Sequence, residues 1–181
     1  MNNPVEGGNY WPTVALTLAL LSPAAPAHAQ GSSPPELPPE CRQFDFWVGD
    51  WNVTEPDGKP AGTNSIELVA GGAGLLEHWT GYPVPAGGTG KSLNAFNRAK
   101  TQWQQFWIGS GGGVLELSGV LVDGSMVLTG EHDVAGRRLR ERITWTPLPD
   151  GTVRQLWQQS ADGGKVWRTV FDGLYRKKPA R

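Results

Sequence analysis

Turn signals recur at short intervals along the last four-fifths of this chain, and they constrain its fold more than any other feature. The nine signals are Asp57-Gly58, Gly71-Gly72, Gly87-Gly88, Arg98-Ala99-Lys100, Gly111-Gly112-Gly113, Asp123-Gly124, Asp133 to Gly136, Asp150-Gly151 and Asp162-Gly163-Gly164. Asp-Gly pairs supply the positive φ angles that tight hairpin turns require. Segments of about 8–12 residues between such turns are typical of antiparallel all-β folds.

The segments between the turns alternate apolar and polar residues with a period of two, which indicates strands. In residues 138–146, one face takes Leu139, Glu141, Ile143 and Trp145, and the other takes arginines and threonines. The connections are all short, which favours an up-and-down barrel over a β-sandwich, and closure removes exposed strand edges. We therefore predict an all-β fold, a single antiparallel barrel of about ten strands over residues 44–178.

The first 29 residues are typical of an export signal. Thr13 to Leu21 is apolar, and Ala27-His28-Ala29 fits a small-x-small cleavage site. The apolar run is far shorter than the ~20 residues that a membrane-spanning helix needs. No Lys or Arg precedes the run, and the alternative is a disordered apolar tail. We expect a periplasmic or secreted protein in which a Pro-rich, disordered linker, residues 30–43, precedes the barrel.

Charge and cysteine content exclude several classes of function. The chain has 16 basic and 17 acidic residues, and the predicted signal holds one acid, Glu6, and no base, so the mature chain is neutral. A neutral chain has no basic surplus with which to bind nucleic-acid phosphates. Cys41 is the single cysteine, which excludes an internal disulfide and a thiolate metal cluster. We interpret it as a spare thiol in the flexible linker.

The motif Gly49-Asp50-Trp51, at the start of the first predicted strand, resembles the Gly-x-Trp motif of lipocalin and calycin barrels. In those barrels the Trp closes the floor, and a basic residue after the last strand stacks on it. The resemblance implies this closing role for Trp51, with Arg176 as the basic residue in a stack worth about 0.5–2 kcal/mol. We expect the preceding Phe44 to Trp47 to form a short helical turn that plugs one end of the barrel.

Longer stretches, from about Phe44 to Tyr175, look similar to an uncharacterised bacterial family of lipocalin-like barrels, a domain of unknown function. The similar segments are 44–51, Leu75 to Trp79, Ser92 to Asn94, Trp103 with Trp107, Ile143 to Gly151 and Gln155 to Trp157. The resemblance implies a fold and no activity. Nitrobindin-like haem barrels, a related family, use a proximal His near the end of the barrel, whereas the last His here is His132. We therefore expect no haem and no other cofactor.

Polar residues interleave with Trp on several predicted strands and would line a pocket if their faces turn inward. The expected lining is Trp79, Asn94, Gln105, Trp107, Gln155, Trp157 and Gln159. Aromatic walls bind apolar or planar molecules, and amides fix polar edges. The alternative is that these side chains fill a small barrel by packing alone. The alternation leaves both interpretations open, because a one-residue shift in register exchanges the two faces of a strand.

Glu77 is the most distinctive polar residue of this expected lumen. It shares a face with Leu75 and Trp79, so it would be a buried carboxylate if that face turns inward. An unpaired buried charge is very costly, and Arg142 or Arg140 is the expected cation. The alternative is a surface glutamate.

No catalytic or metal-binding motif stands out. His78 and His132 lack metal-ligand spacing, and Gly109-Ser110-Gly111 lacks the spacing of a nucleophile elbow. The preferred hypothesis is a non-enzymatic protein that binds or carries a small apolar or aromatic molecule. One alternative is an enzyme that uses Glu77 as acid or base. Another is an assembly protein that docks a partner through outer Trp residues or the arginine-rich 138–142 face.

Overall fold

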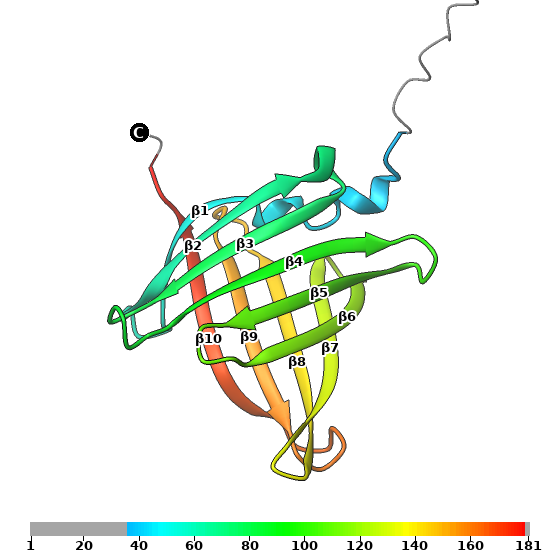
Figure 1. Ribbon diagram of the computed structural model, residues 1–181. Helices are drawn as coiled ribbons and strands as arrows, with labels where there is room; N and C mark the ends of the chain where they lie inside the picture. Colours follow the sequence, from blue (N-terminus) through cyan, green and yellow to red (C-terminus); the bar gives the residue numbers. More distant parts are fainter. Residues whose placement is uncertain (1–35, 180–181) are drawn as a thin grey trace, which may run out of the picture. The chain divides into compact units, whose positions relative to one another are not determined.

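Ten antiparallel strands form one closed barrel in the computed structural model, which describes residues 36–179 (Figure 1). The strands are β1 (Gly49–Thr54), β2 (Pro60–Val69), β3 (Gly74–Gly81), β4 (Thr89–Asn97), β5 (Gln102–Gly109), β6 (Val114–Val122), β7 (Ser125–Val134), β8 (Arg137–Pro147), β9 (Val153–Ser160) and β10 (Arg168–Lys177). Each strand pairs with the next, and β1 pairs with β10. The predicted up-and-down barrel is confirmed. The predicted export signal lies outside the described residues.

The predicted turn signals connect neighbouring strands. Asp123-Gly124 joins β6 to β7, and Ala135-Gly136 joins β7 to β8. All four residues have positive φ angles, between 47° and 79°. Two consecutive positive φ angles are the mark of the type I′ turn, whose twist matches that of paired strands. With turns this short, each strand returns directly beside the previous one.

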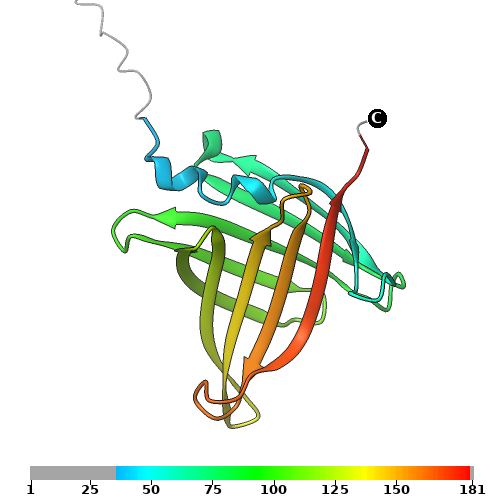
Figure 2. The same ribbon diagram turned by 180° about the vertical axis from the view of Figure 1, so that it is seen from behind.

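Aromatic side chains close one end of the barrel. The 3-10 helix η2 (Asp45–Trp47) lies across this end and buries Phe44 and Trp47 (Figure 2). The centroid of the Phe44 ring lies 5.6 Å from that of Trp103 on β5 and 5.2 Å from that of Trp145 on β8. Trp51 Nε1 donates to the Trp47 carbonyl at 2.9 Å, which fixes the plug to β1. The expected helical turn is therefore present.

The basic residue over the Trp51 indole is Lys177, so the expectation of Arg176 is wrong. Lys177 Nζ lies 5.4 Å from the centroid of the Trp51 ring. Trp51 pairs with Lys177 in the β1–β10 register, whereas Arg176 pairs with Asn52 and lies 3.5 Å from Thr54 Oγ1. Successive residues of a strand point to opposite faces, so a one-residue difference moves the cation away from the indole to the outer surface.

Ordered structure begins before Phe44. The 3-10 helix η1 (Pro39–Arg42) buries Cys41, which is 4% exposed. Arg42 Nη1 donates to the Gly72 carbonyl at 3.5 Å, and Gly72 belongs to η3 (Ala70–Gly72), the turn between β2 and β3. The prediction of a disordered linker is therefore wrong for Pro39–Arg42. The Cys41 thiol is buried against the barrel domain rather than spare in a flexible arm.

Candidate functional site

The barrel lumen contains a cavity of about 200 Å³. Six residues predicted for a pocket line it, namely Glu77, Trp79, Gln105, Trp107, Gln155 and Trp157. The rest of the lining is mainly apolar and includes Leu115, Ile143 and Phe171. Packing of side chains alone accounts for the plugged end of the barrel. It does not account for the open volume of this cavity. Whether the lining residues bind a ligand stays a prediction.

Glycines on neighbouring strands make room for the aromatic rings of the cavity. A Cβ at Gly90 on β4 would lie 2.1 Å from Trp107 Cζ2, and a Cβ at Gly62 on β2 would lie 2.7 Å from Trp79 Cη2. Each indole therefore lies over a stretch of backbone that carries no side chain. Because the rings lie against the wall, they line the lumen without filling it.

The Glu77 carboxylate is buried in the wall of the cavity, and the residue is 4% exposed. Its Oε1 accepts from Asn64 Nδ2 at 2.7 Å, and its Oε2 accepts from Ser92 Oγ at 2.5 Å. Burial raises the pKa of Glu77 to about 7, and the two hydrogen bonds oppose this rise only in part. Among the described residues, no Lys or Arg forms an ion pair with Glu77.

Amide side chains extend the hydrogen-bond network from Glu77 across β4 and β5. Asn94 Nδ2 donates to Ser92 Oγ at 2.9 Å, and Gln105 Nε2 donates to Asn94 Oδ1 at 2.8 Å. Asn94, which was predicted to line the pocket, is fully buried and does not line the cavity. Its role in the network is to fix the orientation of Ser92 and Gln105, because connected buried polar groups hold one another in place.

The Tyr175 hydroxyl connects the Glu77 network to β9. It accepts from Asn64 Nδ2 at 3.3 Å and donates to Gln155 Oε1. Burial and the neighbouring Glu77 charge raise the pKa of Tyr175 well above its ordinary value. The phenol therefore stays protonated and keeps the Gln155 amide oriented at the cavity wall. One part of the lumen thus presents fixed polar groups beside the indoles.

Arg142 does not face Glu77, so the predicted ion pair between them is wrong. The Arg142 guanidinium lies outside the barrel, with Cζ 4.1 Å from the centroid of the Trp167 ring and Nη2 2.8 Å from Gln158 Oε1. The alternation along β8 explains this position. Ile143 is buried and lines the lumen, so its immediate neighbour Arg142 points to the opposite face.

Glu141 is a second buried carboxylate, which the sequence analysis did not single out as a site residue. It is 0% exposed and accepts from Trp157 Nε1 at 2.5 Å and from Gln159 Nε2 at 2.9 Å. His132 Nδ1 lies 3.5 Å from Glu141 Oε1. The signal that could have found Glu141 is its place in the alternation, because it shares a face with the lumen residue Ile143.

Comparison with protein-family models and with curated protein sequences finds no match for this chain. The closed ten-strand barrel is compatible with the lipocalin-like resemblance, which extends no further than the fold. Within residues 36–179, no helix is long and apolar enough to cross a membrane. Over the same residues, no group of three or more His, Cys, Asp or Glu side chains is placed to hold a metal ion. The function therefore has to be argued from the cavity itself.

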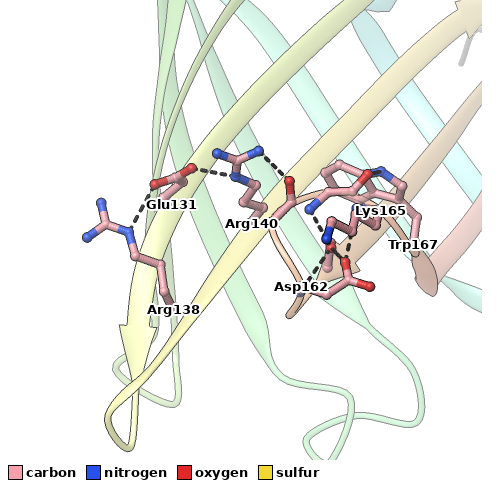
Figure 3. Close-up of polar contacts among 9 residues, drawn as sticks. Glu131, Arg138, Arg140, Asp162, Lys165 and Trp167 are labelled. Atoms are coloured by element: carbon pink, nitrogen blue, oxygen red, sulfur yellow. Dashed lines mark hydrogen bonds and ion pairs between the residues drawn. The ribbon is translucent and has the colours of Figure 1, made fainter.

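Contacts within the chain occupy the arginine-rich face of β8. Arg138 Nε lies 2.9 Å from Glu131 Oε2, and Arg140 Nε lies 2.6 Å from Glu131 Oε1 (Figure 3). The two guanidinium groups lower the pKa of Glu131. Arg140 Nη1 also donates to the Gly163 carbonyl at 2.6 Å, which ties the β9–β10 loop to β8. These arginines thus have partners of their own, and they give no specific support to the assembly hypothesis.

Proposed function

We propose that this protein binds a small apolar or aromatic molecule in the barrel lumen and carries it without chemical change. The cavity of about 200 Å³ with indole walls is the observation that carries the proposal. Small-molecule sites are usually concave and mostly apolar, with a few fixed polar groups. Here Trp79, Trp107 and Trp157 supply the apolar surface, and Gln105 and Tyr175 belong to a fixed polar network. Carriage in the periplasm or outside the cell is part of the proposal and depends on the predicted export signal.

The volume of the cavity limits the ligand to about one ring system. A cavity of about 150 Å³ holds benzene, whereas drug-sized ligands occupy about 300 Å³ or more. A lumen of about 200 Å³ therefore suits a single aromatic ring with a short substituent. A single-ring ligand of this size supports a dissociation constant on the order of 10 µM.

Titration calorimetry with indole, together with native mass spectrometry of the complex, tests the proposal. We expect one indole per chain with a dissociation constant on the order of 10 µM. Leu115→Trp adds an indole to the cavity wall and should abolish binding, because Leu115 lines the lumen. Leu93→Trp is the matched control, since Leu93 is 55% exposed on β4. Indole binding that survives Leu115→Trp would place the site outside the lumen and contradict the proposal.

The raised pKa of Glu77 favours a second candidate function, an enzyme that uses this carboxylate as acid or base. A group with a pKa near 7 exchanges protons efficiently at neutral pH, and groups shifted this far concentrate at functional sites. Native mass spectrometry of wild type and Glu77→Gln, expressed in the same host, separates the two candidates. A compound bound by the wild type, whether or not Glu77→Gln also retains it, supports carriage. A compound that only Glu77→Gln retains supports catalysis.

A further inference from the structure

Two acids are buried in the barrel wall, and no basic side chain is buried with them in residues 36–179. Glu77 on β3 and Glu141 on β8 are the buried carboxylates of the described residues. The strand order separates β3 from β8 by five steps in either direction, so the two acids come from opposite walls of the barrel. Over the described residues, every Lys and Arg is exposed except the half-buried Arg142, which stacks on Trp167 outside the barrel.

The two acids differ in the neighbouring side chains that can compensate their negative charge. Glu141 has His132 at 3.5 Å, a side chain that can become a cation. Glu77 has two neutral donors, the Asn64 amide and the Ser92 hydroxyl. A carboxylate offers about four acceptor positions, so two of those on Glu77 remain open. Because Glu77 also lines the cavity, a molecule in the lumen can reach this carboxylate.

The cavity walls add a second feature that favours a positive charge. Their rings come from Trp79, Trp107, Trp145, Trp157, Phe171 and Tyr175. The face of an aromatic ring attracts a cation electrostatically, most strongly for Trp and in sites away from water. Hydrogen bonds from an ammonium to a carboxylate are about twice as strong as neutral ones. Rings around a buried carboxylate thus form a site suited to an organic ammonium ion.

We propose that the ligand of the lumen is an organic cation, a protonated primary amine carried by a single aromatic ring, whose ammonium group pairs with Glu77. This inference rests on the proposed lumen binding and names the chemical class of its ligand. A buried charge without a partner is costly, so the ammonium supplies the cation that the chain lacks at this position. The ring of the ligand then lies among the indoles. A neutral ring of the same size fits the volume and leaves the carboxylate unpaired.

Titration calorimetry with benzylamine and benzyl alcohol at pH 8 tests this inference. The two probes have nearly the same shape, and only the amine is a cation. We expect wild type to bind benzylamine about tenfold more tightly than benzyl alcohol. Glu77→Gln should weaken benzylamine binding about tenfold and so remove the preference for the amine over the alcohol, because it removes the charge and keeps the side-chain volume. Glu67→Gln is the matched control, since Glu67 is exposed on β2 and bonds His78.

The outcomes distinguish this inference from the proposed lumen binding. Equal affinity of wild type for the two probes overturns the organic cation and leaves lumen binding standing. Benzylamine binding that Glu77→Gln does not weaken also overturns it, because the ammonium then pairs elsewhere. Failure of both probes and of indole to bind overturns lumen binding itself. If Glu77→Gln does not fold, as judged by circular dichroism, the comparison of the two probes in wild type decides the question.

Discussion

Burial favours the protonated form of Glu77, because the carboxylate loses its solvent and gains no cation in exchange. Asn64 and Ser92 each donate one hydrogen bond, and these donors do not offset the loss, so the pKa rises to about 7. Below this pH the side chain is mainly neutral, and above it the cavity wall acquires a negative charge. A single residue therefore makes the stability of the barrel depend on pH near neutrality.

Replacement of Glu77 by Gln should remove this pH dependence. The ordinary pKa of the carboxyl is 4.5, so between pH 4.5 and 7 the folded state binds more protons than the unfolded state. Stability therefore falls as the pH rises through this window, by about 3 kcal/mol. Urea unfolding should show wild type losing about 3 kcal/mol more than Glu77→Gln between pH 4.5 and pH 8. Glu67→Gln serves as the exposed control, and a parallel pH response of wild type and Glu77→Gln would refute the expectation.

Lys177 and Arg176 form a matched pair for testing how the barrel end is closed. Lys177 Nζ lies 5.4 Å from the centroid of the Trp51 ring, whereas Arg176 makes only an exposed contact with Thr54. An exposed cation over an indole stabilises by about 0.5–1 kcal/mol. Lys177→Ala should therefore lower the free energy of unfolding by about this amount, and Arg176→Ala by less. Urea unfolding of both variants measures the difference, and a larger loss for Arg176→Ala would reverse the assignment.

At the scale of strands, the fit between β4 and β5 keeps the cavity open. Gly90→Ala places a Cβ 2.1 Å from Trp107 Cζ2, and the three atoms nearest to this Cβ all belong to the Trp107 side chain. The indole must move toward the lumen, so we expect indole and benzylamine binding to fall at least about tenfold. Gly111→Ala is the control, because a Cβ there meets nothing within 4 Å. Unchanged affinity in Gly90→Ala would mean that the position of Trp107 does not shape the site.

The turns and the alternation predict the barrel because each fixes a local geometry that the neighbouring strand must match. The inward face of a strand is harder to predict from polarity. On β5, Phe106 and Ile108 are 44% and 49% exposed, whereas Gln105 is 4% exposed. The network through Asn94 stabilises the buried amide, and this network joins side chains from different strands. The sequence of a single strand therefore does not determine which of its two faces points into the barrel.

The wrong predictions for Arg142 and Arg176 have the same physical cause. The charge of Arg142 predicts a pair with Glu77, but the alternation that makes Ile143 a core residue places Arg142 outside. The position of Arg176 near the end of the domain predicts a stack on Trp51, but the register puts Lys177 over Trp51 instead. In both cases, a shift of one residue along the strand places the side chain on the opposite face of the sheet. Glu141 shares a face of β8 with Ile143 and Trp145, so its burial follows once that face is known to point inward.

For the whole molecule, the seam between β1 and β10 decides whether the sheet is a barrel. Every other pair of neighbouring strands is joined by a short connection that sets its register, whereas β1 and β10 lie at opposite ends of the domain sequence. Their register matches Trp51 to Lys177, Asn52 to Arg176 and Val53 to Tyr175. The buried partners Val53 and Tyr175 contribute to this seam, because a shifted register would turn them toward solvent.

A disulfide across the seam tests both closure and register. Asn52 and Arg176 are exposed and directly opposite, and residues in such positions have Cα atoms about 4.5–5.5 Å apart, within the range of about 4.4–6.8 Å that a disulfide spans. Asn52→Cys with Arg176→Cys should therefore oxidise readily and raise the free energy of unfolding by about 2–4 kcal/mol. Asn52→Cys with Lys178→Cys is the control, because diagonal positions lie about 7–8 Å apart. Intact mass and free-thiol counts, with the buried Cys41 common to all forms, report the bond. Preferential oxidation of the control pair would establish a different register, and failure of both pairs to oxidise would indicate an open sheet.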